Sequence, residues 1–150
     1  MDKKYELTAE CKEIGNHKLY RIRALKAIPK FGVRVGDLGG WIESEYNLSQ
    51  NGKAWVGGEA YVYGEAKIWD EGMVYGKAKV GGKAKVGGEA MVRGEAKVGG
   101  NAWVHGNATI TDNAKVYGEA EVCGRALVCG EAEVSGDAKV CGNVMVCGLR

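Results

Sequence analysis

Histidine, cysteine and lysine are the side chains of this sequence that could take part in acid–base, nucleophilic or metal chemistry. The chain of 150 residues contains only two His and five Cys. A general base needs a partner group that positions it, and no such partner is evident beside His105, while His17 falls in a predicted turn. We therefore predict no catalytic residue and no enzyme activity.

Four closely spaced lysines form a basic band that no acidic residue interrupts between positions 72 and 88. The members of this band are Lys77, Lys79, Lys83 and Lys85. One interpretation is a solvated face, on which nearby residues such as Glu65 and Glu95 dilute the repulsion. The other is a binding site for a small anionic ligand. The net charge of +2 and the scarcity of aromatic residues argue against a nucleic-acid partner.

The elements that must position these side chains belong to a strict repeat, A-x-V-x-G-x, which runs from Gly52 to the end of the sequence. Its Ala positions depart from Ala only at Gly72 and Val144, and its Val positions depart only to Ile. Ala and Val lie two residues apart, so they share one face of a short strand. The Gly positions, replaced only by Asp70 and Asp112, indicate corners with positive φ.

A period of six with these residues resembles the hexapeptide-repeat left-handed parallel β-helix. The resemblance covers residues 52–150 and implies an all-β fold in which every three hexads complete one triangular coil. About five coils then stack at roughly 4.8 Å each. Residues 1–51 lack the repeat and predict a small N-terminal β cap, with two strands around Gly15-Asn16-His17 and short β pieces at 33–35 and 41–42.

Coils of three hexads place outward side chains in vertical columns, and one column of the residue between Ala and Val is apolar. Its members are Trp55, Met73, Met91, Thr109, Leu127 and Met145. The corresponding columns of the other two faces are mainly charged. A long apolar patch is typical of an interface, so we expect a homo-oligomer. The family favours a trimer, while one apolar face also suits a dimer. Tyr75 and Arg93, near this column, are candidate ligand or partner contacts.

The same coil places Cys123 next to Cys141 and Cys129 next to Cys147. Neighbouring coils lie within the Cα separation that a disulfide requires. We nevertheless favour stacked free thiols, because five Cys without an export signal indicate a reduced compartment. No metal site is predicted, because the two pairs lie at different corners and His105 lies only one coil from Cys123.

Many hexapeptide-repeat proteins are acyl-CoA-dependent acyltransferases with a catalytic His and an extruded loop at a subunit groove. The uninterrupted repeat leaves no such loop, although an acyltransferase stays an alternative. The γ-carbonic anhydrases of this fold use three His ligands for zinc, which two His cannot supply. No cofactor is expected.

The opening LYRIRALKAIPKFGVRVGDLGGWIESEYNLS, followed by G-x-A-x-V repeats, resembles a group of uncharacterised proteins carried by phages and prophages. That resemblance implies a non-catalytic binding protein that acts on a host protein, a host defence or a small ligand in the host cytoplasm. A purely structural spacer is a further alternative. No apolar run is long enough to cross a bilayer, and the N-terminus lacks an apolar signal-peptide core, so neither a membrane span nor export is predicted.

Overall fold

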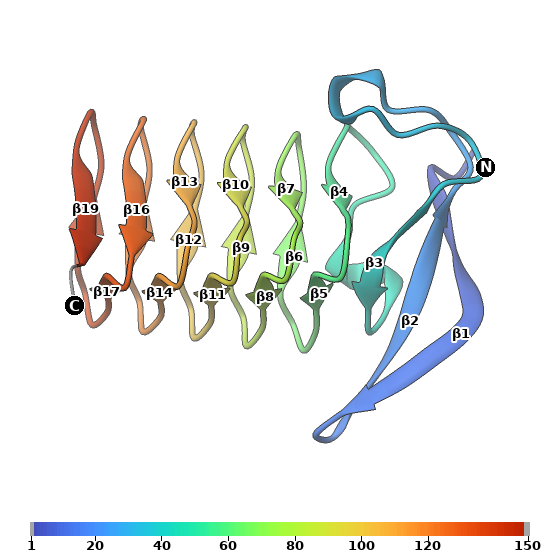
Figure 1. The fold of residues 1–150 in the computed structure, drawn as a ribbon, viewed down its shortest axis with the longest axis horizontal. Coiled ribbons are helices and arrows are strands. Elements are labelled where there is room, and N and C mark those ends of the chain that lie inside the picture. Colours follow the sequence, from blue (N-terminus) through green and yellow to red (C-terminus); the bar gives the residue numbers. More distant parts are fainter. Residues whose placement is uncertain (1, 149–150) are drawn as a thin grey trace.

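The computed structural model of the protein describes residues 2–148, which form an all-β rod of stacked coils with a cap at its N-terminal end (Figure 1). Residues three hexads apart pair in parallel register, as Met73 does with Met91 and Lys79 with Lys97. This arrangement is consistent with a left-handed parallel β-helix and confirms the predicted fold class. No α-helix occurs in the described residues, and two short 3-10 helices lie in the cap: η1 (Pro29–Phe31) and η2 (Glu45–Asn47).

Three parallel sheets form the three sides of the rod. The apolar face consists of β4 (Trp55–Val56), β7 (Met73–Val74), β10 (Met91–Val92), β13 (Thr109–Ile110), β16 (Leu127–Gly130) and β19 (Met145–Gly148). The lysine face consists of β5 (Tyr61–Val62), β8 (Lys79–Val80), β11 (Lys97–Val98), β14 (Lys115–Val116) and β17 (Glu133–Val134). The mixed face consists of β6 (Lys67–Ile68), β9 (Lys85–Val86), β12 (Trp103–Val104), β15 (Glu121–Val122) and β18 (Lys139–Val140).

The interior of the rod is a column of Ala and Val side chains. Every repeat Ala and Val is buried until the last coil, where Ala138 is exposed and Val140 is half-buried. Only small residues fit this column, which explains why the inward positions of the repeat contain nothing larger than Ile. At the exception, Gly72, a Cβ would lie 3.0 Å from the backbone oxygen of Val86 and 3.3 Å from Cγ2 of Ile68, so the space there is tight even for Ala.

The corners need positive φ, and the structure confirms the reason for the Gly positions. Gly100 and Gly118, for example, have φ of 62° and 71°, and the two Asp substitutes, Asp70 and Asp112, have φ of 56° and 61°. Asp tolerates this conformation better than most residues that carry a Cβ. The carboxylate of Asp112 also accepts a hydrogen bond of 2.9 Å from the backbone N–H of Gly130 in the next coil.

The cap extends the sheet of the lysine face. Strands β1 (Tyr5–Ile14) and β2 (His17–Ala24) form an antiparallel hairpin, and β2 pairs with β3 (Leu38–Ile42). Strand β3 then pairs in parallel with β5, so β3 closes the N-terminal end of the lysine face (Figure 1). The predicted hairpin is confirmed, with His17 beginning the second strand. Residues 33–35 were wrongly predicted as a β piece: Val33 makes only an isolated bridge to Ile28, because the chain turns there.

The β-helix begins with an irregular coil that precedes the first A-x-V-x-G-x hexad. Leu48 bridges in parallel to Ile68, so β3, Leu48 and β4 lie one coil before β5, β6 and β7 on the three faces. Asn47 joins this irregular coil to the next one. Its fully buried amide accepts hydrogen bonds from the N–H groups of Glu43 and Ser44, and it donates to the carbonyls of Gly64 and Ala66.

Two buried polar side chains fix β1 against the rod. The Lys4 ammonium donates to the carbonyl oxygens of Ala54, at 2.6 Å, and Gly52, at 3.3 Å. Burial lowers the pKa of Lys4 to about 8. The Tyr5 hydroxyl donates to the carbonyl of Leu48 at 2.5 Å. Burial, and secondarily the charge of Glu45, raise the pKa of Tyr5 above its usual value.

Candidate functional site

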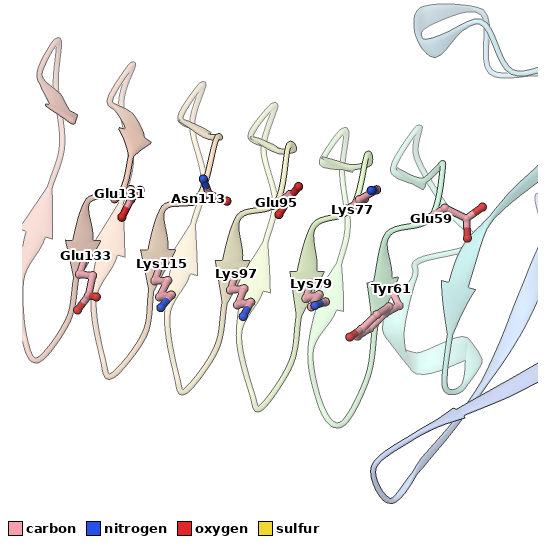
Figure 2. Close-up of a pocket in the computed structure, with 10 residues that line it drawn as sticks. All are labelled: Glu59, Tyr61, Lys77, Lys79, Glu95, Lys97, Asn113, Lys115, Glu131 and Glu133. Carbon is pink, nitrogen blue, oxygen red and sulfur yellow. The ribbon is translucent and has the colours of Figure 1, made fainter. Parts of the chain in front are cut away.

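A surface groove with a volume of about 490 Å³ runs along the lysine face. Two parallel rows of side chains line it, one from the strands and one from the corner residues before them (Figure 2). The strand row contains Tyr61, Lys79, Lys97, Lys115 and Glu133, and the corner row contains Glu59, Lys77, Glu95, Asn113 and Glu131. Each row follows from the three-hexad coil, because residues at that spacing lie directly above one another.

The positive charges of this groove are concentrated in the middle of its strand row. Lys79, Lys97 and Lys115 pair in register, so three ammonium groups follow one another in the middle of the strand row. Unscreened repulsion between such neighbours is about 1 kcal/mol in water. The four Lys of the groove are matched by four Glu, at its two ends and along the corner row, so its formal charge is zero.

The predicted basic band does not form one surface. Lys77 and Lys79 line the groove of the lysine face, whereas Lys83 and Lys85 line a groove on the mixed face. The separation has a simple cause. Residues six apart in the repeat lie on adjacent sides of a three-sided coil, so charges that are close in sequence point in different directions.

The cap closes the N-terminal end of the lysine-face groove with stacked aromatic and cationic side chains. The Lys12 ammonium lies 4.3 Å from the ring centre of Trp41 and 5.6 Å from that of Tyr61. The Arg21 guanidinium lies 5.1 Å from the Trp41 ring, and Arg21 forms an ion pair of 3.6 Å with Glu59. These contacts could not be predicted from the sequence, because cap and rod residues share no repeat that would place them together.

The mixed face has a second groove of about 490 Å³ with a more aromatic lining. It is lined by Tyr46, Glu65, Trp69, Lys83, Lys85, Asn101 and Trp103. Gly87 makes room for the Trp69 ring, since a Cβ at Gly87 would lie 2.5 Å from that ring. Trp69 and Gly87 are three hexads apart, and this spacing was a usable signal for their contact. Tyr46 and Trp103 are exposed, and Lys83 and Lys85 give the groove part of its positive charge.

The predicted apolar column lies on one face, as expected. Consecutive members pair in register from Trp55 to Met145. Trp55 is nevertheless buried, with 2% of its surface exposed, because the cap covers it and Tyr5 packs edge-on against its ring. Trp55 therefore contributes to the cap and not to an accessible interface. Tyr75 and Arg93 lie at the corner after the apolar face, half-buried and exposed respectively.

Both histidines have carboxylate partners, contrary to the expectation for His105. His105 Nε2 lies 2.6 Å from Glu121 Oε2, and the His105 ring stacks on Trp103 at 4.1 Å between ring centres. In the cap, His17 Nδ1 lies 3.0 Å from Glu43 Oε1. The contact joins residues 16 apart, which is not the three-hexad spacing, so the repeat does not reveal it. Glu121 precedes Cys123 by two residues, and both point outward around the buried Val122.

The four repeat cysteines form two disulfides, Cys123–Cys141 and Cys129–Cys147, with Cα separations of 4.5 Å. The expectation of free thiols is therefore corrected for these residues, and Cys11 is the one free cysteine within the described part of the chain. The coil spacing alone brings each pair within bonding distance. His105, Glu121 and Cys123 also bring a nitrogen, an oxygen and a sulfur atom within 4.8 Å of one another.

Comparison with models of known protein families gives no match, and comparison with curated proteins gives none either. Within residues 2–148, the structure has no helix with the length and apolar character needed to cross a bilayer.

Proposed function

We propose that this chain is a non-catalytic binding protein that self-associates through its apolar face and presents the grooves of the other two faces to a partner. The observation that carries the proposal is the sorting of outward side chains by face. Met73, Met91 and Leu127 follow one another along the apolar face, while lysines occupy the central positions of the lysine face.

The energetics are compatible with association. Without the buried Trp55, four large apolar side chains are left for an interface: Met73, Met91, Leu127 and Met145. Burying each contributes about 1.5–3 kcal/mol. Met73, Met91 and Leu127 are already half-buried in the single chain, so the gain lies below the roughly 6–12 kcal/mol that four fully exposed side chains would give. It still overlaps the roughly 4–15 kcal/mol that association costs. Dimer and trimer both satisfy this estimate.

Light scattering of the wild-type protein and of Met91→Glu tests the assembly. We expect the wild type to be a dimer or trimer at micromolar concentration, and Met91→Glu to be a monomer with an unchanged circular dichroism spectrum. Lys97→Glu is the matched control. It introduces the same residue into the next strand, β11, on the lysine face, and it should leave the oligomer intact. A monomeric wild type at high micromolar concentration, or dissociation by Lys97→Glu alone, would refute self-association through the apolar face.

The binding partner is proposed from the grooves and from the resemblance to phage-carried proteins. A small anionic ligand, or an acidic segment of a host cytoplasmic protein, would place its negative charge over Lys79, Lys97 and Lys115. Thermal shift with a panel of polycarboxylates and phosphorylated metabolites tests the small-ligand form. A shift in the wild type that Lys97→Gln abolishes supports it. Pull-down of a host protein that Lys97→Gln releases supports the acidic-segment form, and failure of both assays contradicts a partner at this groove.

An acyl-CoA-dependent acyltransferase is the second candidate, and one observation favours it. The contact of 2.6 Å between His105 and Glu121 gives His105 the positioning partner that a general base needs. Incubation with acetyl-CoA and a panel of acceptors tests this activity. Release of free coenzyme A that His105→Ala abolishes would favour the transferase over the binding protein. A purely structural spacer predicts neither ligand binding nor coenzyme A release.

A further inference from the structure

His105, Glu121 and the Cys123–Cys141 pair form a cluster at one edge of the mixed face, and their chemistry is that of a metal site. A ring nitrogen of His105, a Glu121 carboxylate oxygen and Cys123 Sγ all lie within 4.8 Å of one another. Cys141 stands directly beside Cys123 in the next coil, with Cα atoms 4.5 Å apart. One imidazole, one carboxylate and two thiolates make four ligands, which is the number that tetrahedral zinc requires.

We infer that the reduced form of this cluster binds one Zn²⁺ ion per chain through His105, Glu121, Cys123 and Cys141. Zinc bonds of about 2.0–2.3 Å place the ligand atoms of a tetrahedral site roughly 3–4 Å apart. The His105–Glu121 contact of 2.6 Å must open slightly, and the sulfur atoms of Cys123 and Cys141 must both approach the other ligands. The side chains of His105 and Glu121 are about a quarter exposed, which leaves them room to rotate.

The surroundings support such a site. Trp103 stacks on the His105 ring at 4.1 Å and holds its orientation. The Lys139 ammonium lies 3.9 Å from Glu121 Oε1. A loaded site with one carboxylate, two thiolates and Zn²⁺ carries one net negative charge, which Lys139 compensates. The strands beneath the ligands are fixed by coil-to-coil hydrogen bonds, such as that from the Cys123 N–H to the Val140 carbonyl at 2.9 Å.

Binding depends on the redox state of the cysteine pair. The disulfide must first accept two electrons and two protons from a thiol reductant, whose own two thiols become a disulfide. Zn²⁺ then displaces the two thiol protons to solvent as both sulfurs become thiolates. Oxidation with release of Zn²⁺ reverses these steps. The second pair, Cys129–Cys147, lies on the apolar face and belongs to the same strands as Leu127 and Met145.

Cobalt titration of the reduced full-length protein tests the inference, since tetrahedral Co²⁺ with thiolate ligands has characteristic visible and near-ultraviolet bands. The titrated protein carries Cys11→Ser, Cys129→Ser and Cys147→Ser, so that only the cluster cysteines are left. We expect one Co²⁺ per chain with thiolate charge-transfer absorption, and displacement by Zn²⁺. His105→Ala and Glu121→Gln should each weaken binding by at least about tenfold. His17→Ala, which removes the other His–Glu pair, should not change it.

Wild-type protein provides a second measurement that does not depend on the folding of the serine variants. Zn²⁺ should protect Cys123 and Cys141 of the reduced protein from iodoacetamide, as mapped by mass spectrometry, while Cys129 and Cys147 stay reactive. Four results would each overturn the inference: no tetrahedral cobalt spectrum, equal affinity in His105→Ala, equal binding by the oxidised protein, or equal protection of both cysteine pairs.

Discussion

Replacing Gly100 with alanine should destabilise the β-helix strongly, while the same change at its neighbour Gly99 should not. Gly100 has φ of +62°, and a Cβ there would lie 2.7 Å from the backbone nitrogen and 2.8 Å from the oxygen of Gly118 in the next coil. Gly99 lies outside the positive-φ region and has open space where a Cβ would stand. Gly136 supplies the intermediate case, because it has φ of +63° but no atom within 4 Å of its Cβ position.

These three positions separate the two free-energy costs of adding a Cβ, one from the backbone conformation and one from close contact with the next coil. The left-handed conformation costs a residue with a Cβ about 1–2 kcal/mol, which is the expected loss for Gly136→Ala. Overpacking costs a further 1–3 kcal/mol or so, because the backbone of Gly118 cannot move aside like a flexible side chain. Gly100→Ala should therefore lose about 2–5 kcal/mol in total. Gly99→Ala should be neutral or stabilise the protein by up to about 1 kcal/mol.

Urea denaturation followed by far-ultraviolet circular dichroism gives the free energy of unfolding for the three variants. Because coils of a solenoid can unfold separately, hydrogen exchange of the Lys83 and Asn101 amides should accompany it. These amides donate to the carbonyls of Gly100 and Gly118, both at 2.7 Å, and should exchange faster in Gly100→Ala. Equal losses in Gly100→Ala and Gly136→Ala would show that adjacent coils separate easily, and the reasoning from close backbone approach would be refuted.

Three further predictions concern the cap and the cysteines. Asn47→Ala should lower the free energy of unfolding by about 2–5 kcal/mol in urea denaturation, because it removes the four hydrogen bonds of a fully buried side chain; a loss below about 1 kcal/mol would contradict this role. Stability measured against pH should rise from pH 8 toward 10, because Lys4 releases its proton near pH 8 when folded and near 10.5 when unfolded. It should fall above pH 10, where unfolded Tyr5 ionises and folded Tyr5 does not, and Lys4→Met should abolish the rising limb. Alkylation of the native protein without reductant should label Cys11 alone, and labelling of Cys129 or Cys147 would contradict the disulfides.

The rod was predictable because its determinants are local and periodic. Each hexad contains the same pattern of a buried Ala, a buried Val and a corner Gly. A departure from the pattern at one hexad therefore does not change the fold that the other hexads predict. The spacing of three hexads then fixes which side chains share a face, and the register of Met73 with Met91 follows directly. The cysteine pairs were placed correctly by the same spacing, although their oxidation state was not.

The cap and the sites were less predictable for physical reasons. Cap contacts join residues far apart in sequence without a repeat, so neither the cover over Trp55 nor the hydrogen bonds of Asn47 could be foreseen. The lysine band was misassigned because proximity along the chain was taken for proximity in space. Glu121 was missed because its contact with His105 spans 16 residues, which joins a strand position to a corner position of the preceding coil.

The uninterrupted repeat restricts how the length of this protein can change. Deleting residues 76–93 would remove a whole turn and leave every later side chain on its original side, only nearer to the cap. Deleting a single hexad would instead rotate everything downstream by a third of a turn and bring Met91 into line with the side that now carries Lys85. Gene duplications and deletions that keep each side chain on its original face of the rod must therefore add or remove a multiple of eighteen codons.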